Sequence, residues 1–174
     1  ASPDFSSAPV TKDTRSPIAI ELDVPAWRAR LARVSEQALQ YADVHESNIS
    51  LDAVASTRII VNSEGTHLVL PRAVYVLNLS VNTTADDGAA LQVYESILAA
   101  TPEELPTEDG LSATFTEMVD RLAALRDAPV AEPTTAPAIL RGRAAAVFFH
   151  EVLGHRIESH RQRDDDEGQT FKDM

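Results

Sequence analysis

The sequence contains no cysteine, and it is poor in basic residues and in long apolar runs. Without cysteine the chain has no disulfides, no thiolate catalysis and no cysteine-ligated metal site of its own. Lys and Arg total 15 against 27 Asp and Glu, and such an acidic surface repels nucleic-acid phosphates, so direct nucleic-acid binding is disfavoured. No apolar run approaches the ~20 residues of a membrane span, so none is expected.

Apolar residues nevertheless make up 44% of the chain, enough for a real core. Its 174 residues suit one domain, or one domain plus part of another. The uneven distribution of charge along the chain supports one domain plus part of another. Residues 1–136 carry 9 basic and 20 acidic side chains, whereas residues 137–174 carry 6 and 7. We therefore expect an acidic N-terminal domain followed by a nearly balanced segment.

The first 16 residues are small, polar and proline-containing, which predicts a disordered lead over 1–16. The sequence begins without an initiator Met and without a signal peptide. The lack of cysteine is compatible with export, and an exported or periplasmic location is favoured over a cytoplasmic one.

Residues 17–128 have the pattern of an α+β domain. Pro25 opens a helical pattern with an apolar face, and a second helix is expected near 112–125 with Ser112 as its N-cap. Between them, β-branched and alternating stretches separated by turns at 62–65 and 86–88 predict an antiparallel meander of about four strands. The apolar faces of the two helices are Trp27, Leu31, Val34 and Ala38, and then Phe115, Met118, Val119, Leu122 and Leu125.

A proline-rich stretch, 129–137, is typical of an extended linker and marks the domain boundary. After it, residues 138–174 are expected to begin a second domain with a helix that runs into a histidine-rich stretch.

Three of the five histidines lie within eleven residues, and the first two form the pattern H-E-x-x-x-H: His150, Glu151 and His155. In a regular α-helix, residues five apart differ by ~140° and point apart. For both imidazoles to reach one metal ion, the helix must widen by a π-type turn or stop between them. Gly154, directly before His155, is the residue that would permit either. Glu151 would then be a general base beside a metal-activated water.

The other histidines are weaker candidates. His160 is a spare metal ligand, a substrate contact or only a solvated residue, and these alternatives stay open. His45 and His67, in strand-like segments, are expected to be structural.

The segment 137–171 resembles the metal-binding segment of the TldD/PmbA metallopeptidases, the putative modulators of DNA gyrase. Weaker similarities at 61–66 and 128–130 extend this resemblance over most of the chain as that family's N-terminal domain. The resemblance rests on His150, Glu151, His155, Gly154, Glu158 and the tail at 167–171.

The resemblance implies a Zn²⁺-dependent peptidase that hydrolyses unfolded polypeptides and forms a homo- or hetero-oligomer with a related subunit. His150 and His155 would bind zinc, and Glu151 would be catalytic. Glu158, three residues after His155, would orient that imidazole as a partner of the ligand.

Two departures from the family pattern qualify this expectation. Ser159 stands where many members have glycine. The family's third zinc ligand is a cysteine in a large downstream domain, and this chain has none. The expected site is therefore incomplete, and the 174 residues are expected to be inactive alone, as a truncated fragment of the peptidase.

The sequence is compatible with two other interpretations. One is a non-catalytic interaction subunit of a TldD/PmbA-like complex, and the other is a free-standing acidic binding domain. The intact His150, Glu151 and His155 set favours the peptidase, because neither alternative has a physical need for all three.

Overall fold

The computed structural model describes residues 9–161. The chain divides into two compact units, one from Pro9 to Val130 and one that includes the residues from Ala131 onward. This division falls within the stretch expected to be a linker, 129–137. Within the described range, none of the helices has the length and hydropathy of a membrane span.

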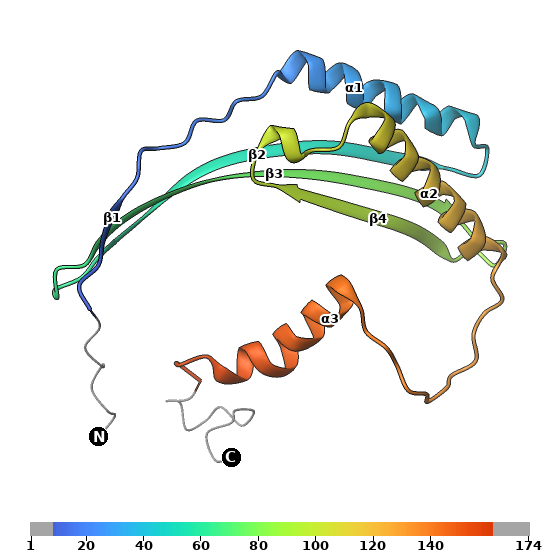
Figure 1. Cartoon of the computed structure of the whole chain (residues 1–174). Helices are drawn as coiled ribbons and strands as arrows, with labels where there is room; N and C mark the ends of the chain where they lie inside the picture. Colours follow the sequence, from blue (N-terminus) through green and yellow to red (C-terminus); the bar gives the residue numbers. More distant parts are fainter. Residues whose placement is uncertain (1–8, 162–174) are drawn as a thin grey trace. The chain divides into compact units, whose positions relative to one another are not determined.

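The first unit is built on a four-stranded sheet (Figure 1). β2, β3 and β4 form an antiparallel meander in which β3 is central. A short strand, β1, pairs parallel with the start of β3. Gly65 and Gly88, at φ 97° and 87°, lie in the two connecting turns, where glycine tolerates the left-handed backbone. The strands are β1 (Lys12–Thr14), β2 (Glu46–Val61), β3 (His67–Thr84) and β4 (Ala90–Ala99).

The α+β class and the two turns are confirmed, but the sheet corrects two predictions. The meander has three strands rather than about four, and the fourth strand is parallel. That strand, Lys12–Thr14, lies inside the stretch predicted to be disordered, so the prediction is wrong for these residues. Pairing with β3 orders them, and local sequence did not reveal it. Residues 1–8 of the predicted lead lie outside the described residues.

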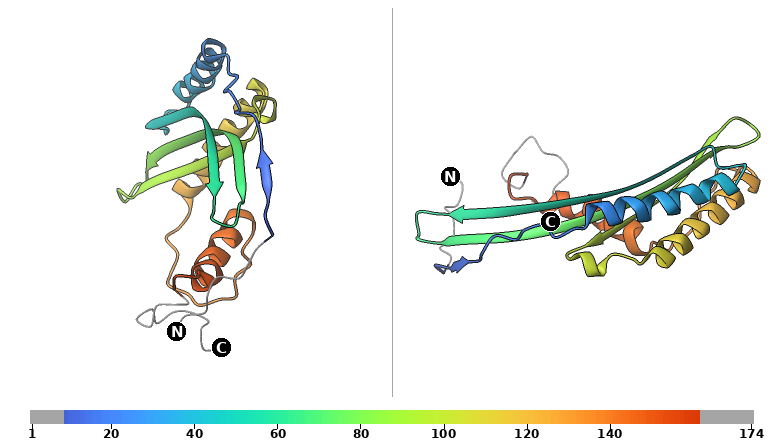
Figure 2. Two further views of the ribbon diagram at one scale, coloured as in Figure 1. Left: turned by 90° about the vertical axis from the view of Figure 1, so that its left-hand side faces the viewer. Right: turned by 90° about the horizontal axis from the view of Figure 1, so that it is seen from above.

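Two helices lie on one face of this sheet (Figure 2). α1 (Val24–Glu36) begins at Asp23, whose side chain accepts from the Ala26 N–H at 3.0 Å, and continues into a 3₁₀ turn at Gln37–Gln40. α2 (Glu108–Asp127) begins at Thr107, whose hydroxyl accepts from the Gly110 N–H at 3.2 Å.

Ser112 was expected to cap α2, but it lies inside the helix. Its hydroxyl instead accepts from Gln37 Nε2 at 2.8 Å and so connects the end of α1 to α2. Arg33 adds a bidentate ion pair from α1 to Glu108, with distances of 2.7 and 2.6 Å. The two helices are therefore joined by polar contacts at their edges and by apolar packing beneath.

The core lies between the helices and the sheet. Alternate residues of β3 face the helices and are almost fully buried, as the alternation predicts. The predicted apolar faces of α1 and α2 pack on them, except that Leu125 is 48% exposed. The most buried side chains are Val34, Tyr75, Leu77, Leu79, Val81, Leu111, Phe115 and Met118.

In the second unit, residues 131–141 contain neither helix nor strand. α3 (Gly142–Phe149) follows and continues without a break into a π-helical turn, His150–Gly154, and a 3₁₀ turn, His155–Ile157. These three helical pieces carry the motif.

Candidate metal centre

The motif lies on a helix that widens where the histidine spacing requires it. The five residues His150–Gly154 form a π-helical turn, so of the two expected alternatives, a widened helix or a helix that stops between the histidines, the structure has the first. A π-turn places residues five apart in successive turns of the helix, as an α-helix does for residues four apart. The extra residue of H-E-x-x-x-H is thus absorbed by the backbone, and His150 and His155 share one side.

The side chains meet as this backbone predicts. The ring centroids of His150 and His155 lie 4.5 Å apart, edge to face at 74°. One ligand atom each from His150, Glu151 and His155 can be chosen so that all lie within 4.8 Å of one another. This His–Glu–His cluster could hold a metal ion.

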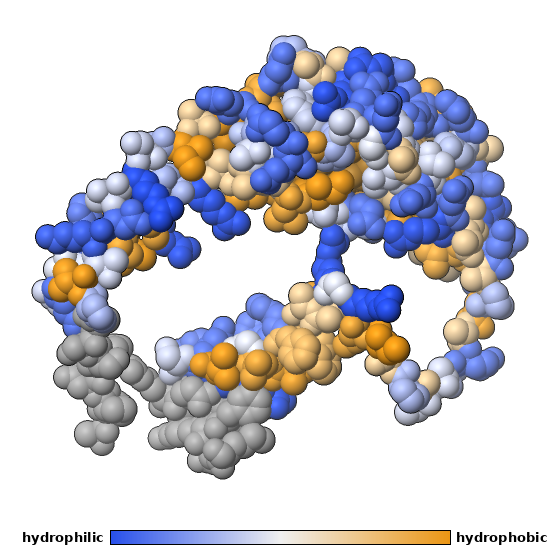
Figure 3. Space-filling model, viewed as in Figure 1, coloured by the Kyte–Doolittle hydropathy of each residue, from blue (hydrophilic) through white to orange (hydrophobic). Residues whose placement is uncertain are grey.

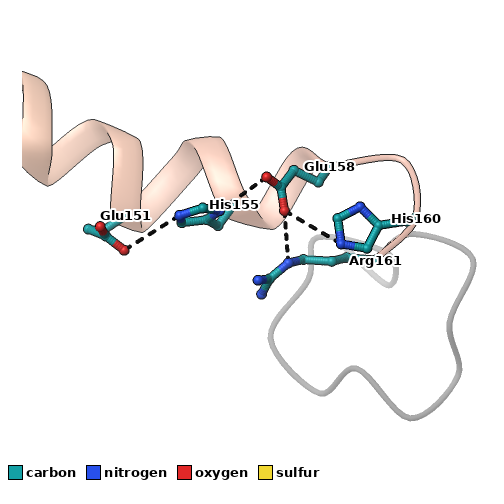
Figure 4. A network of polar contacts seen from close by, with 5 residues as sticks. All are labelled: Glu151, His155, Glu158, His160 and Arg161. Atoms are coloured by element: carbon teal, nitrogen blue, oxygen red, sulfur yellow. Dashed lines mark hydrogen bonds and ion pairs between the residues drawn. The ribbon is translucent and has the colours of Figure 1, made fainter.

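Glu158 determines the orientation of His155 (Figure 4). Its Oε1 lies 3.1 Å from Nδ1 of His155. The hydrogen bond from His155, followed by Arg161, lowers the pKa of the Glu158 carboxyl below its usual value. An ionised carboxylate only accepts, so Nδ1 carries the proton and donates it. In the neutral imidazole, Nε2 then keeps its lone pair for a metal.

Nε2 of His155 is also the nitrogen on the side of Glu151. It lies 3.8 Å from Glu151 Oε2. The His155 side chain is 34% exposed and that of Glu151 is 62% exposed, so a small ion or a water molecule can reach the space between them. Both side chains are therefore partly accessible to solvent.

Gly154 lies in the π-turn, but not for the reason expected. Its φ and ψ are −52° and −56°, ordinary right-handed helical values. A Cβ added there would lie 3.8 Å from the Phe149 carbonyl oxygen and 3.9 Å from His150 Nδ1, which are ordinary contacts. The turn exists without the special conformational freedom of glycine.

His160 is not part of the cluster. Its Nε2 lies 3.7 Å from Glu158 Oε2, and its side chain is 72% exposed. Arg161, which the sequence reasoning did not single out, donates from Nε to the same carboxylate oxygen at 2.9 Å. The two residues lie after the helix, in and beside a turn, so helical spacing could not have found this pair. Ser159 lies beside these residues, in a turn.

The two remaining histidines belong to the other unit. His45 lies with Nδ1 3.4 Å from the Thr84 hydroxyl, and His67 opens β3 and pairs with Lys12 of β1. Both positions suit the structural roles expected of them.

The helix that carries the cluster exposes much apolar surface, visible as orange side chains along α3 in Figure 3. Phe149 and Ile157 are 62% and 59% exposed, and none of the residues of α3 or of the two turns after it is buried. The exposed apolar set is Val147, Phe148, Phe149, Val152, Leu153 and Ile157.

No family model, no curated protein and no solved structure matches the chain. The tail at 167–171, which contributes to the resemblance, lies outside the described residues.

Proposed function

We propose that this chain is the N-terminal part of a zinc-dependent peptidase of the TldD/PmbA kind that hydrolyses unfolded polypeptides. The observation that carries the proposal is the π-turn at His150–Gly154, which brings His150, Glu151 and His155 into one cluster. A regular helix would separate the two imidazoles.

The donor set suits zinc. Two imidazole nitrogens with a carboxylate beside them are ligand types of catalytic zinc sites. Zinc–nitrogen bonds of 2.0–2.1 Å place two tetrahedral ligands ~3.3 Å apart. The observed spacing, within 4.8 Å, is close enough for small side-chain rotations to reach that value.

The fixed proton on Nδ1 of His155 adds to this fit. Glu158 holds the imidazole so that Nε2 faces Glu151, as expected for a ligand with a carboxylate partner. Arg161 in turn holds Glu158 at 2.9 Å. His155 would therefore bind a metal without first having to change its tautomer.

Glu151 is proposed as the general base rather than as a third ligand. A zinc ion in the cluster would supply a Lewis acid and lower the pKa of a water molecule in its shell. The Glu151 carboxylate would accept the proton of the attacking water and pass it to the leaving amine. The remaining zinc ligand would come from outside these 174 residues, so the chain alone would bind zinc weakly and be inactive.

A second candidate is an interaction subunit without catalysis. The exposed apolar side chains of α3 favour it, since a surface of this kind marks contact with another domain or subunit. A related subunit is a partner under both candidates, so the metal chemistry has to separate them.

The test compares Glu151→Gln and His155→Ala in the full-length protein. Glu151→Gln is nearly isosteric, so zinc should stay bound while peptide hydrolysis falls by about 10²–10⁴-fold. His155→Ala should remove the zinc, because one ligand from this chain remains. Glu132→Gln, in the exposed stretch after α2, is the matched control and should change neither.

Zinc content and turnover of an unfolded peptide are measured side by side. If Glu151→Gln kept near-normal turnover, Glu151 would not be the general base, and the interaction subunit would be the better explanation. If His155→Ala retained its zinc, His155 would not be a zinc ligand and the proposed metal centre would be wrong.

A further inference from the structure

β2 is a long strand with one unpaired edge. All 16 of its residues pair with β3 on one side, and within residues 9–161 no strand pairs with the other side. Figure 2 shows it along one edge of the sheet. No proline interrupts it. A long open edge offers a row of unpaired N–H and C=O groups to another strand.

The hydrogen bonding of the β2–β3 turn shows which groups face outward. The Asn62 N–H donates to the Thr66 carbonyl at 3.3 Å, which continues the register of the two strands. Because the bonding direction alternates along an antiparallel strand, even-numbered residues of β2 bond to β3. Odd-numbered residues therefore point their N–H and C=O groups to the open edge, with Ala55 near the middle.

Two charges on this strand suit pairing with an identical strand. Asp52 and Arg58 lie on the same face of β2, six residues and thus ~20 Å apart, too far to pair within one chain. Neither forms an ion pair or side-chain hydrogen bond with another described residue. If two β2 strands pair antiparallel about Ala55, each Asp52 lies opposite Arg58 of the second copy. That register also places odd-numbered residues opposite odd-numbered ones, as the outward hydrogen-bonding groups require.

The opposite face of β2 is complementary in the same register. Ile59 and Val61, 65% and 68% exposed, would lie opposite Leu51 and Ile49 of the second copy. Leu51 and Ile49 form part of the floor of an apolar groove of about 590 Å³ beside α1. Directly opposite side chains on paired strands lie 4.5–5.5 Å apart, so the exposed residues of one copy would cover this groove in the other. The groove is lined by Ile20, Leu22, Val24, Trp27, Arg28, Leu31, Ile49, Leu51 and Ala53.

We infer that two copies of this chain associate through their β2 strands, antiparallel about a twofold axis at Ala55, and form one continuous sheet. In this one register the outward N–H and C=O groups face each other, two Asp52–Arg58 pairs form, and the exposed apolar side chains are covered. The inference does not depend on the metal centre, because every residue that carries it belongs to the 9–130 unit.

The charge pairs give a sharp test by sedimentation velocity over a concentration series, at 0.15 M salt to screen the overall negative charge. In Arg58→Asp, the new aspartate of each copy lies opposite Asp52 of the other, so two repulsive pairs replace two attractive ones. The dimer dissociation constant should rise about tenfold or more. Asp52→Arg should do the same. The double variant, Asp52→Arg with Arg58→Asp, restores both pairs in reverse and should return the constant to near its wild-type value.

Arg72→Asp is the matched control. Arg72 is exposed on the same face but lies on β3, paired with Ser56 and one strand in from the edge. It changes the net charge by the same amount and should leave the dissociation constant nearly unchanged.

Ala55→Pro tests the backbone contact separately. Proline removes an N–H that faces solvent in the isolated chain, a position where an edge strand tolerates it. The dimer should be lost while far-ultraviolet circular dichroism stays native. A wild-type chain that stays monomeric at 100 µM (~10⁻⁴ M, a weak limit for any interface) overturns the inference. A dimer that resists Arg58→Asp and Ala55→Pro, or one that the double variant fails to restore, overturns it equally.

Discussion

Replacing Gly154 by alanine should strengthen the metal site. The residue has helical backbone angles, φ −52° and ψ −56°, which alanine adopts without strain. The new Cβ would lie 3.8 and 3.9 Å from its nearest atoms, at ordinary van der Waals distance. Neither the backbone nor the available space therefore opposes the substitution.

The magnitude follows from helix propensity. Alanine is better than glycine in a helix by about 0.8–1.0 kcal/mol, chiefly because glycine loses more backbone freedom on ordering. Metal binding requires the ordered turn. If the turn is only partly formed without metal, the difference in helix propensity adds to the free energy of zinc binding. We expect the zinc dissociation constant to fall by up to about fivefold. Competition against a chromophoric chelator measures it.

Gly142→Ala is the contrasting control. Gly142, the first residue of α3, has φ +52°, where a side chain is strained although nothing lies within 4 Å. The same chemical change should there weaken the helix and zinc binding. A tenfold or greater loss of zinc affinity in Gly154→Ala would refute the reasoning. It would show that the bound state needs a backbone conformation at Gly154 that only glycine adopts.

Two further predictions concern the 9–130 unit. Phe115→Ala should lower the free energy of unfolding by about 3–5 kcal/mol in urea melts, because the ring is fully buried in the core. Leu125→Ala, at a residue 48% exposed, should lower it much less, and equal losses would contradict the assigned core. The Arg33 guanidinium lowers the pKa of the Glu108 carboxyl, so their pairing contributes stability that is fully present above the unfolded pKa of about 4.3 and is lost as the pH falls through the lower folded value. Glu108→Gln should therefore flatten the loss of stability between about pH 5 and 3, and an unchanged acid limb would show that the pair contributes nothing.

The elements that could be predicted from the sequence are those whose signal is local and periodic. Alternation identified the buried side of β3, and the i, i+3, i+4 spacing identified the core side of α2. The requirement that His150 and His155 reach one metal ion left two alternatives, a π-type turn or a helix that stops between them, and the structure has the π-turn at His150–Gly154.

The elements that could not be predicted depend on contacts distant in sequence or on competing local signals. β1 has three residues and no pattern of its own, and only its pairing with His67–Val69 of β3 makes it a strand. α2 begins before the predicted cap at Ser112, because the Thr107 hydroxyl accepts the Gly110 N–H and caps the helix there. The bond between Arg161 and Glu158 forms across an irregular turn after the helix, for which the sequence has no periodic signal.

The unequal strand lengths give the sheet two levels of stability. β4 pairs with β3 only from Tyr75 onward and β1 pairs only with residues 67–69, so residues 54–58 and 70–74 form a two-stranded ribbon. All of residues 54–58 are exposed, so few apolar contacts protect the hydrogen bonds of this ribbon. Local opening there requires much less free energy than global unfolding. In a chain whose β2 edge is unpaired, we therefore expect the ribbon to open and reclose while the core stays folded, so that a single free energy of unfolding does not describe both parts.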